Sequence, residues 1–372
     1  MSSVSSHLCR AAVFTATDRP LELREFDVPD PQAGEAVVRV ECCTVCGSDL
    51  HTITGKREEP TPTILGHEIL GRVESVGEPP LNDLTGEPLS PGARITWSVA
   101  VSCGECDRCQ SGFPQKCRSL VKYGHSLAIG PHALSGGFAE KILLRAGTAA
   151  IKVDESLPAE VICPVNCATA TIAAAYRVGG ETTGQNVLIF GAGMLGLTAA
   201  AWANSAKARS VTVCDQNSTR LEQAKRFGAN RTILWQDDRE AFQTQLLQET
   251  DVEGFDLILE LSGAPAAISA AAQLTTIGSR IVLVGSVMPV GDVGFDPEQI
   301  VRRWLSIHGV HNYTPSDLAT AVRFLEAHQA DYPWLDIVET EFSLDEINDA
   351  VRDAIERRPI RMAVKPQPGA YA

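Results

Sequence analysis

Residues 186–196 read Asn186-Val-Leu-Ile-Phe-Gly-Ala-Gly-Met-Leu-Gly196, a short apolar run that ends in a glycine-rich turn. The run predicts a buried strand, and the Ala-rich segment that continues to about Lys207 predicts a helix. A second apolar strand, Ser210-Val-Thr-Val-Cys214, follows and leads into Asp215. Strand, glycine turn, helix and strand in this order predict the first unit of a parallel, doubly wound sheet.

The glycines of this turn have separate physical roles in binding a dinucleotide. Gly191 permits the tight turn, Gly193 lets the backbone approach a pyrophosphate, and Gly196 lets helix and strand pack closely, while the helix N-terminus adds a positive dipole. Asp215 is placed to accept hydrogen bonds from the adenosine ribose and to repel a 2′-phosphate. NAD is therefore favoured over NADP, although Arg220 stands nearby. The predicted cofactor-binding residues are Gly191, Gly193, Met194, Leu195, Gly196, Asp215 and Arg220.

The alternation of strands and helices continues beyond this unit. Further strands are expected at Arg231–Leu234, Phe255–Leu261 and Arg280–Gly285, with helices between them. Strands that are apolar throughout predict a parallel sheet that is covered on both faces. Because 372 residues are too many for one ordinary core, we expect two domains.

The first part of the chain has a different pattern. From Ala11 to Val40 apolar and polar residues alternate between turn signals, as in Leu21–Phe26, and further strands are expected at Ile69–Gly77 and Ala93–Trp97. Short strands joined by tight turns predict a small β barrel or sandwich. The C-terminal part ends in a strand-like segment, Ile360–Val364, and is expected to return to this first domain.

A cysteine and a histidine near the start of the chain have the surroundings of a partly open metal site. They lie in Cys46-Gly-Ser-Asp-Leu-His51 and in Gly66-His67-Glu68. Thiolate and neutral imidazole are good Zn²⁺ ligands, and a catalytic zinc needs only three protein ligands besides an exchangeable position. Asp49 is placed to accept the spare N–H of a ligating histidine. Ser48 and His51 offer a hydroxyl and an imidazole that can carry a proton outward.

The third ligand of this site must come from elsewhere in the chain. An Ala-rich segment of helical character, from Pro158 to Tyr176, carries Cys163 and Cys167. Either thiolate suits zinc, and the pattern of residues alone does not choose between them.

Four further cysteines form a compact cluster, spaced C-x2-C-x2-C-x7-C. They are Cys103, Cys106, Cys109 and Cys117. Four thiolates can surround one tetrahedral Zn²⁺ and leave no position for water, so the spacing predicts a closed structural site. Bacterial iron–sulfur proteins begin with the same spacing, but their fourth cysteine comes three residues on and precedes proline, which this one does not.

Charge and cysteine content limit the partners and the compartment. The net charge of −14 and the pI near 5.1 argue against nucleic acid or an anionic membrane surface, because both require clustered Lys and Arg. The first residues, Met1-Ser-Ser-Val-Ser-Ser6, lack the charged and apolar regions of a secretory signal. Eleven cysteines without a signal indicate a reducing compartment, where clustered cysteines bind metal. We therefore expect a cytoplasmic protein.

With these residues in view, the chain resembles the zinc-dependent alcohol dehydrogenases of the medium-chain dehydrogenase/reductase superfamily, from about Ala11 onward. The two metal-site motifs, the four-cysteine lobe and the glycine turn appear in the family's order. The resemblance implies an α/β fold class: a GroES-like β-barrel catalytic domain and a Rossmann doubly wound parallel-sheet coenzyme domain, with the active site in the cleft between them. The implied domains are residues 1–160 and 306–372, with a structural zinc lobe at about 102–118, and residues 161–305.

The resemblance also implies roles for single residues. In family members a Cys-Ala-x-x-Thr segment carries the third zinc ligand, which selects Cys167. The implied activity is reversible hydride transfer between an alcohol and NAD, giving an aldehyde or a ketone, with the proton leaving through Ser48 and His51 and with Glu68 near the zinc. The implied partners are a small-molecule alcohol or aldehyde and further copies of the chain. A homodimer or homotetramer is expected, with Ile281–Gly285 and the turn after it as the subunit contact.

Three segments look like a bacterial subgroup of the superfamily that is associated with phosphonate catabolism. They are Glu78–Gly92, which we expect to form an exposed loop, Trp97-Ser98 and Pro164–Thr171. A phosphonate-linked substrate would need cations in its site. The candidates are Lys56, Arg57, Lys122 and His125.

Two other functions are open at this point. A zinc-free reductase of activated double bonds would belong to the same superfamily, but such members lack the Cys and His ligands. A non-catalytic NAD-binding or zinc-binding structural protein would be expected to lose Ser48, His51 and the third ligand first, and this sequence has candidates for all three.

Overall fold

The computed structural model describes residues 8–236, 239–250 and 252–366. The chain forms two compact units, one of Met1–Ala170, Thr314–Gln329 and Trp334–Ala372 and one of Thr171–Tyr313 and Ala330–Pro333. The interpretation of Met1–Ser6 lies outside the described residues. The domain bounds of 1–160, 161–305 and 306–372 stay a prediction.

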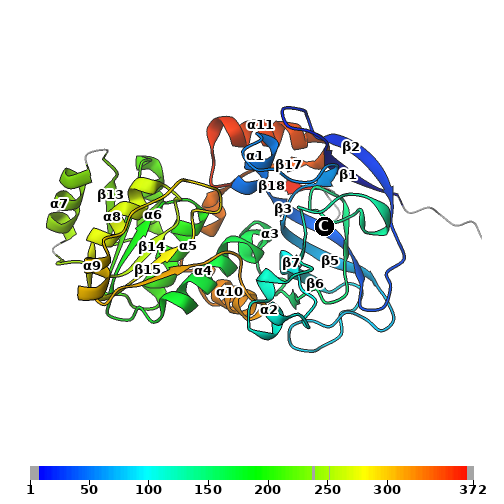
Figure 1. Cartoon of the computed structure of the whole chain (residues 1–372). Coiled ribbons are helices and arrows are strands. Elements are labelled where there is room, and N and C mark those ends of the chain that lie inside the picture. Colours follow the sequence, from blue (N-terminus) through cyan, green and yellow to red (C-terminus); the bar gives the residue numbers. More distant parts are fainter. Residues whose placement is uncertain (1–7, 237–238, 251, 367–372) are drawn as a thin grey trace, which may run out of the picture. The chain divides into compact units, whose positions relative to one another are not determined.

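The second unit is built on a sheet of parallel strands in the order β13-β12-β11-β14-β15-β16. Of these strands, β13, β14 and β15 are labelled in Figure 1. The strands are β11 (Asn186–Phe190), β12 (Ser210–Asp215), β13 (Arg231–Leu234), β14 (Phe255–Glu260), β15 (Thr275–Leu283) and β16 (Ser306–Gly309). The helices in this part of the chain are α4 (Ala168–Gly179), α5 (Met194–Ser205), α6 (Ser218–Arg226), α7 (Arg239–Thr250), α8 (Pro265–Gln273) and α9 (Pro297–Arg302). The predicted doubly wound parallel sheet is confirmed.

The apolar strands of this sheet are buried as their sequences predict. Val187, Leu188 and Ile189 have no exposed surface, and aromatic residues such as Phe190 and Phe255 pack in the core. Each large apolar side chain stabilises the fold by about 1.5–3 kcal/mol when it is fully buried. The strand order reverses between β12 and β14, on either side of β11, so the glycine turn lies at the switch point of the sheet.

The strand β15 is a central strand of this sheet. β15 lies between β14 and β16, and Ile281 and Val282 on it have no exposed surface. The edge of the sheet on this side is therefore β16, whereas the turn after β15 is exposed at Ser286 and Val287. The subunit contact expected at Ile281–Gly285 and the turn after it stays a prediction.

The first unit contains a larger mixed sheet in the order β10-β6-β5-β3-β18-β17, with β9 paired to β3, a small sheet in the order β2-β1-β4, and the pair β7-β8. Its strands are β1 (Leu8–Phe14), β2 (Glu22–Asp27), β3 (Ala36–Thr44), β4 (Thr63–Ile64), β5 (Glu68–Val76), β6 (Arg94–Trp97), β7 (Ala100–Val101), β8 (Val121–Lys122), β9 (Lys141–Leu144), β10 (Ala150–Lys152), β17 (Val338–Ser343) and β18 (Arg361–Lys365). The predicted β-rich first domain is confirmed.

Short helices connect these strands. The α-helices are α1 (Gly47–Ile53), α2 (Asp107–Gln110), α3 (Ala159–Ile162), α10 (Pro315–His328) and α11 (Ile347–Arg357). The 3₁₀ helices are η1 (Pro114–Lys116), η2 (Gly130–His132), η3 (Cys163–Asn166), η4 (Trp334–Ile337) and η5 (Leu344–Glu346). The core of this unit includes the fully buried side chains of Trp97, Phe138 and Ile69.

The C-terminal segment completes the larger sheet of the first unit. β18, drawn in red, pairs antiparallel with β3, drawn in blue, and parallel with β17 (Figure 1). Met362, Ala363 and Val364 are fully buried. This segment therefore returns to the first unit as expected, and it carries one charged residue, Arg361, into the interior.

Two further expectations concern the surface. The loop Glu78–Gly92 is exposed over much of its length, but Leu81 and Leu89 are buried and joined by a backbone hydrogen bond of 2.8 Å. In the described part of the chain, no single helix is long and apolar enough to cross a membrane. The pair Ala159–Asn166 and Ala168–Gly179 would pass by length and composition only as a span bent by 51°.

Replacing Gly196 by alanine is expected to destabilise the second unit. An added Cβ atom would lie 1.8 Å from the carbonyl oxygen of Gly191, so α5 or the glycine turn would have to shift. Such overpacking costs about 1–3 kcal/mol of the free energy of unfolding. The matched control is Gly193→Ala, whose added Cβ atom meets nothing within 4 Å. Urea unfolding measures both variants, and equal stability would contradict the packing argument.

Candidate functional site

Four potential metal ligands from separate parts of the chain meet in the first unit. The ligand atoms of Cys46, His67, Glu68 and Cys167 all lie within 4.8 Å of one another, and we call these residues the metal group. Cys46 directly precedes α1, His67 directly precedes β5, and Cys167 joins η3 to α4. Cys46, His67 and Glu68 are buried, whereas Cys167 is partly exposed. The group therefore has one open side.

The imidazole of His67 is oriented with Nε2 toward the other candidate ligands. Nε2 lies 3.5 Å from Sγ of Cys167 and 3.3 Å from Oγ of Ser48. Ser48 is the second residue of α1 and is partly exposed. The predicted ligand His67 and the predicted proton carrier Ser48 are thus brought together.

Asp49 ties the two ligand-bearing segments to each other. Its carboxylate accepts hydrogen bonds from the backbone N–H of Cys46, at 2.9 Å, and of Gly66, at 3.2 Å. Oδ1 also lies 3.3 Å from Nδ1 of His67, without the alignment of a hydrogen bond. Since Asp49 has no exposed surface, these contacts replace the water that would otherwise solvate its carboxylate.

The pKa shifts of Cys46, His67 and Cys167 show that these residues share protons that a bound cation could replace. The pKa of Cys46 is lowered well below its usual value, first by a hydrogen bond from the Cys167 thiol, and the pKa of Cys167 is raised by the same bond. Burial lowers the pKa of His67, but the Asp49 carboxylate and Cys46 raise it further, so the net shift is upward. Metal ligation needs deprotonated thiols and a neutral imidazole, so a divalent cation would replace these shared protons. Two thiols, one imidazole and an open side fit a catalytic Zn²⁺.

Glu68 is held by a residue that sequence reasoning missed. Arg361 of β18 donates from Nε and NH2 to the two oxygens of Glu68, at 2.7 and 2.8 Å, and its NH2 lies 3.6 Å from Sγ of Cys46. Thr44 donates a further hydrogen bond of 2.6 Å to the Glu68 carboxylate. The one signal in the sequence is a charged residue within the apolar segment Ile360–Val364.

The two candidates for the third ligand are separated by the structure. Cys163 has no exposed surface, and its thiol donates to the carbonyl oxygens of Cys42 and Glu68, at 3.0 and 3.1 Å. Cys163 does not belong to the metal group, whereas Cys167 does. Burial raises the pKa of Cys163 well above its usual value.

Asn166 is a second residue that the sequence did not single out. Its amide donates to the carbonyl oxygen of His67, at 3.1 Å, and to that of Trp97, at 2.9 Å. Asn166 has no exposed surface and directly precedes Cys167. One side chain therefore fixes the backbone at two candidate metal ligands.

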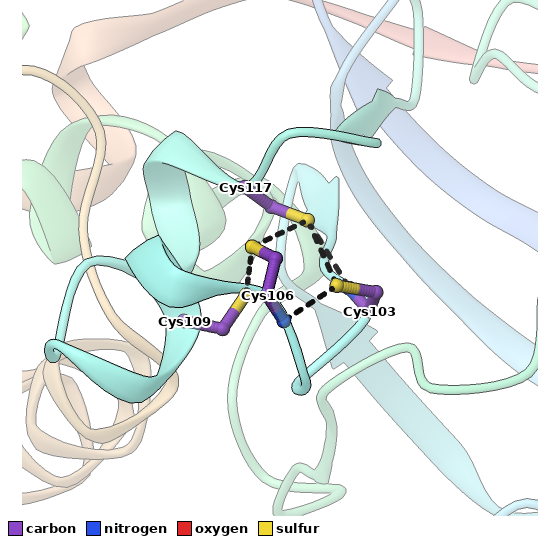
Figure 2. Close-up of side chains that lie close together, drawn as sticks. All are labelled: Cys103, Cys106, Cys109 and Cys117. Carbon is purple, nitrogen blue, oxygen red and sulfur yellow. Dashed lines mark hydrogen bonds between the residues drawn. The ribbon is translucent and has the colours of Figure 1, made fainter.

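The four clustered cysteines form a second group, with all ligand atoms within 4.8 Å of one another. Figure 2 shows the sulfur atoms turned toward one another, with Sγ of Cys106 at 3.5 Å from Cys109 and 3.9 Å from Cys117. Sγ of Cys117 and Cys103 are 3.4 Å apart. The backbone N–H of Cys103 donates to Sγ of Cys117 and helps lower the pKa of that thiol to about 6. Four sulfurs at these distances fit a closed tetrahedral Zn²⁺ site.

In the second unit the predicted cofactor residues gather at the carboxyl ends of β11 and β12. Gly191 has a φ of 99° and Gly193 directly precedes α5, whose first residues are Met194, Leu195 and Gly196. Asp215 ends β12, and its Oδ2 accepts a 2.6 Å hydrogen bond from the backbone N–H of Ala192 in the glycine turn. Arg220 lies in the first turn of α6 and is partly exposed.

The remaining predicted residues lie in the first unit. His51 is on α1 and partly exposed, and its pKa is lowered mainly by burial. Lys56 is exposed in the loop that follows α1. The ring of His125 packs against that of His67, with centroids 5.0 Å apart and planes inclined by 33°. Lys122 ends β8 and is half-buried.

Comparison with known proteins matches both units of this fold. Residues 32–155 match the alcohol dehydrogenase GroES-like domain family, and residues 195–327 match the zinc-binding dehydrogenase family. The 5-exo-hydroxycamphor dehydrogenase of Pseudomonas putida is 30% identical over 92% of this chain and 94% of its own. The L-threonine 3-dehydrogenase of Anaeromyxobacter dehalogenans strain 2CP-C is 33% identical over 77% of this chain and 79% of its own.

Solved structures agree with these matches. An alcohol dehydrogenase from Thermotoga maritima is 29% identical and superposes with a TM-score of 0.90 over 97% of this chain and 100% of its own. A zinc-binding dehydrogenase from Sinorhizobium meliloti 1021, bound to NADP, is 26% identical, with a TM-score of 0.83 over 96% of this chain and 99% of its own. The chain belongs to the zinc-binding alcohol dehydrogenase family of the medium-chain dehydrogenase/reductase superfamily. Its α/β fold with a GroES-like domain is that of the family, and it is an enzyme of the zinc-dependent alcohol dehydrogenase type.

Replacing Asn166 by alanine is expected to loosen the metal group. Two buried carbonyl groups lose their donor, which costs roughly 1–3 kcal/mol of the free energy of unfolding each. The control is Asn348→Ala, because Asn348 also makes two side-chain hydrogen bonds to the backbone, one accepted from the N–H of Leu21 and one donated to its carbonyl oxygen, outside the metal group.

Both variants should lose stability, but only Asn166→Ala should lose zinc faster to a chelator, which a colorimetric zinc indicator follows over time. Equal zinc loss from the two variants would show that Asn166 contributes stability alone.

Proposed function

We propose that this chain catalyses reversible hydride transfer between an alcohol and NAD, with a zinc ion held by Cys46, His67 and Cys167. The observation that carries the proposal is the metal group, whose sulfur and nitrogen atoms lie within 4.8 Å of one another and which is open at Cys167. A zinc ion in such a site supplies Lewis acidity, which lowers the pKa of a hydroxyl that binds to it. The products would be an aldehyde or a ketone and NADH.

Ser48 and His51 are proposed to carry the substrate proton outward. Ser48 Oγ lies 3.3 Å from Nε2 of His67 and is partly exposed, so it can meet both the substrate hydroxyl and solvent. Burial lowers the pKa of His51 on the same helix. A lowered pKa leaves the imidazole unprotonated over more of the neutral range, as a proton acceptor must be.

Asp49 and Glu68 are proposed to act on the ligands, not on the substrate. Asp49 faces Nδ1 of His67, which leaves Nε2 for the metal. Glu68 neutralises Arg361, whose guanidinium stabilises the thiolate of Cys46. The second zinc, in the four-cysteine group, is proposed to be structural, because four thiolates leave no position for a substrate.

NAD is proposed as the coenzyme, bound by the glycine turn and Asp215. The Asp215 carboxylate is already oriented by the N–H groups of Ala192 and Asn217, at 2.6 and 2.8 Å, and can still accept from ribose hydroxyls. Its charge would repel a 2′-phosphate. Arg220 nearby and the NADP-bound relative make NADP the alternative.

We also propose that the chain assembles into a homodimer or homotetramer through the edge of the sheet in the second unit. β16 is an edge strand, and large apolar side chains close to it in sequence are exposed: Val301 by 79% and Trp304 by 82%. Val287, in the turn after β15, is exposed by 58%. Apolar side chains that are this exposed are typical of protein interfaces.

The narrower substrate question is the charge of the alcohol. A phosphonate-linked substrate is our proposal from the subgroup resemblance, whereas the two relatives described above are named for hydroxycamphor and L-threonine. The metal group argues against a zinc-free reductase of activated double bonds. Turnover of any alcohol would exclude a purely structural protein.

The first test of the proposal is reduction of NAD by the zinc-loaded protein across a panel of primary, secondary and aromatic alcohols. Cys46→Ser should abolish turnover yet leave NADH binding nearly intact, since the predicted coenzyme residues belong to the second unit. Cys9→Ser is the control, because Cys9 is a buried cysteine outside both metal groups. Unchanged turnover in Cys46→Ser would contradict the assignment of Cys46 as a ligand of a catalytic zinc.

The second test concerns the proton path. His51→Gln should slow alcohol oxidation by on the order of 100-fold near neutral pH, because the proton acceptor is lost. The loss should shrink as the pH rises, since hydroxide can then take the proton. A pH–rate profile of kcat/KM measures both effects. A profile identical to that of the wild-type enzyme would remove His51 from the path.

A further inference from the structure

Four side chains beside the metal group form what we call the cationic cluster: Arg57, Glu59, Lys122 and His125. All four belong to the first unit. Arg57 and Glu59 lie in the loop after α1, Lys122 ends β8, and His125 lies in the turn that follows β8. The cluster contains two permanent cations and one carboxylate, in a chain whose net charge is −14.

The turn that carries His125 is pressed against the metal group by a glycine. Gly124 has a φ of 74°, and an added Cβ atom would lie 2.7 Å from the carbonyl oxygen of Gly66 and 3.0 Å from Cβ of His67. The backbone N–H of Gly124 donates to Ser135 at 2.7 Å, which fixes the turn. The close approach lets the His125 ring pack on the His67 ring. The cluster is therefore a built part of the site.

The only carboxylate of the cluster is already used. Oε1 of Glu59 lies 2.6 Å from NH2 of Arg57 and 3.1 Å from Nδ1 of His125. Glu59 and His125 expose only 10% and 8% of their side chains. Glu59 therefore fixes the positions of Arg57 and His125 and has little capacity left for a further cation.

Lys122 is the cation of the cluster for which no ion pair is formed among the described residues, because Glu59 pairs with Arg57 and His125. Within the described residues, no carboxylate lies within ion-pair distance of its ammonium group. Burial, and then the charges of Arg57 and Lys116, lower its pKa, and the smaller attractions of Glu59 and Cys167 offset only part of this. A half-buried ammonium group beside like charges is less stable than one in water, so a further anion bound beside Lys122 would be favourable.

The cations and the open side of the metal group are both accessible to solvent. Cys167, Ser48 and His51 keep exposed surface, as do Arg57 and Lys122. Lys122 begins the turn that packs on the metal group, since its carbonyl oxygen accepts the backbone N–H of His125 at 3.3 Å and the His125 ring packs on that of His67. An alcohol bound at this side would therefore place any negative group that it carries near Lys122 and Arg57.

We propose that Lys122 and Arg57 form a subsite for an anionic group on the alcohol, a carboxylate or a phosphonate, and that the enzyme selects short anionic hydroxy compounds over neutral alcohols. Glu59 and His125 are positioning residues of this subsite. The inference rests on the proposed oxidation of an alcohol at the metal group. Beyond that function, the inference states that the substrate is anionic and names the residues that bind its charged group.

The test uses alcohols of equal chain length that differ only at the far end: a neutral diol, a hydroxycarboxylate and a hydroxyalkylphosphonate. The wild-type enzyme should show a higher kcat/KM for one or both anionic compounds, and the better anion identifies the group. Lys122→Gln should lower kcat/KM for that anion by about 10- to 100-fold, mainly through KM, because a charge-assisted hydrogen bond is lost. Oxidation of the diol should change by less than about twofold. Lys122→Arg should restore part of the preference.

The matched control is Lys152→Gln, which removes an equal charge from an exposed lysine of β10. A parallel titration with propanoate and propylphosphonate, which carry no hydroxyl, measures binding without turnover. A neutral diol oxidised as well as the anions, or an anion preference that survives Lys122→Gln, would overturn the subsite and leave the dehydrogenase assignment standing. Lys122-dependent binding of these anions without oxidation of any alcohol would support the subsite and refute the proposed function.

Discussion

The buried carboxylate of Asp49 is the constraint on which the metal group depends. It accepts the backbone N–H groups of Cys46 and Gly66 and faces Nδ1 of His67, and it begins helix α1 as the acidic partner of the Cys46 cap. A carboxylate with no exposed surface is tolerable only with such donors. The same contacts therefore satisfy the charge, start the helix that carries Ser48 and His51, and bring together two ligand segments that are separated in the chain.

The C-terminal strand β18 brings a positive charge, that of Arg361, to the metal group. Arg361 reaches Glu68 from a position 293 residues further along the chain and lies 3.6 Å from Sγ of Cys46. A buried ion pair is costly to assemble, and removing one partner would leave an uncompensated charge beside the ligands. This explains physically why the last strand must return to the first unit: without β18, Glu68 would stay buried and unpaired. Asn166 couples His67 to the Cys167 segment in the same manner, through neutral hydrogen bonds.

Short-range patterns in the sequence predict much of this fold, whereas contacts between residues far apart in the sequence were not predicted. The glycine turn, the apolar parallel strands and the four-cysteine spacing are local patterns whose geometry follows from neighbouring residues, and the sheet is parallel as predicted. Arg361, Asn166 and Glu59 act through residues far from them in sequence or through a tertiary approach such as that of Gly124 to Gly66, which no local pattern encodes. The central position of β15 and the edge position of β16 also escape local patterns, because whether a strand is central or at an edge depends on the whole sheet.

The central claim is that two thiol-containing groups in one unit hold zinc for different purposes. X-ray absorption at the zinc edge, combined with metal counting on the purified chain, tests this claim most directly. We expect two zinc ions per chain, one for each group, with an average shell of sulfur and a little nitrogen or oxygen. In Cys109→Ser the remaining zinc should show sulfur, nitrogen and one exchangeable oxygen ligand. A single zinc in the wild-type chain, or a shell without sulfur, would contradict the account.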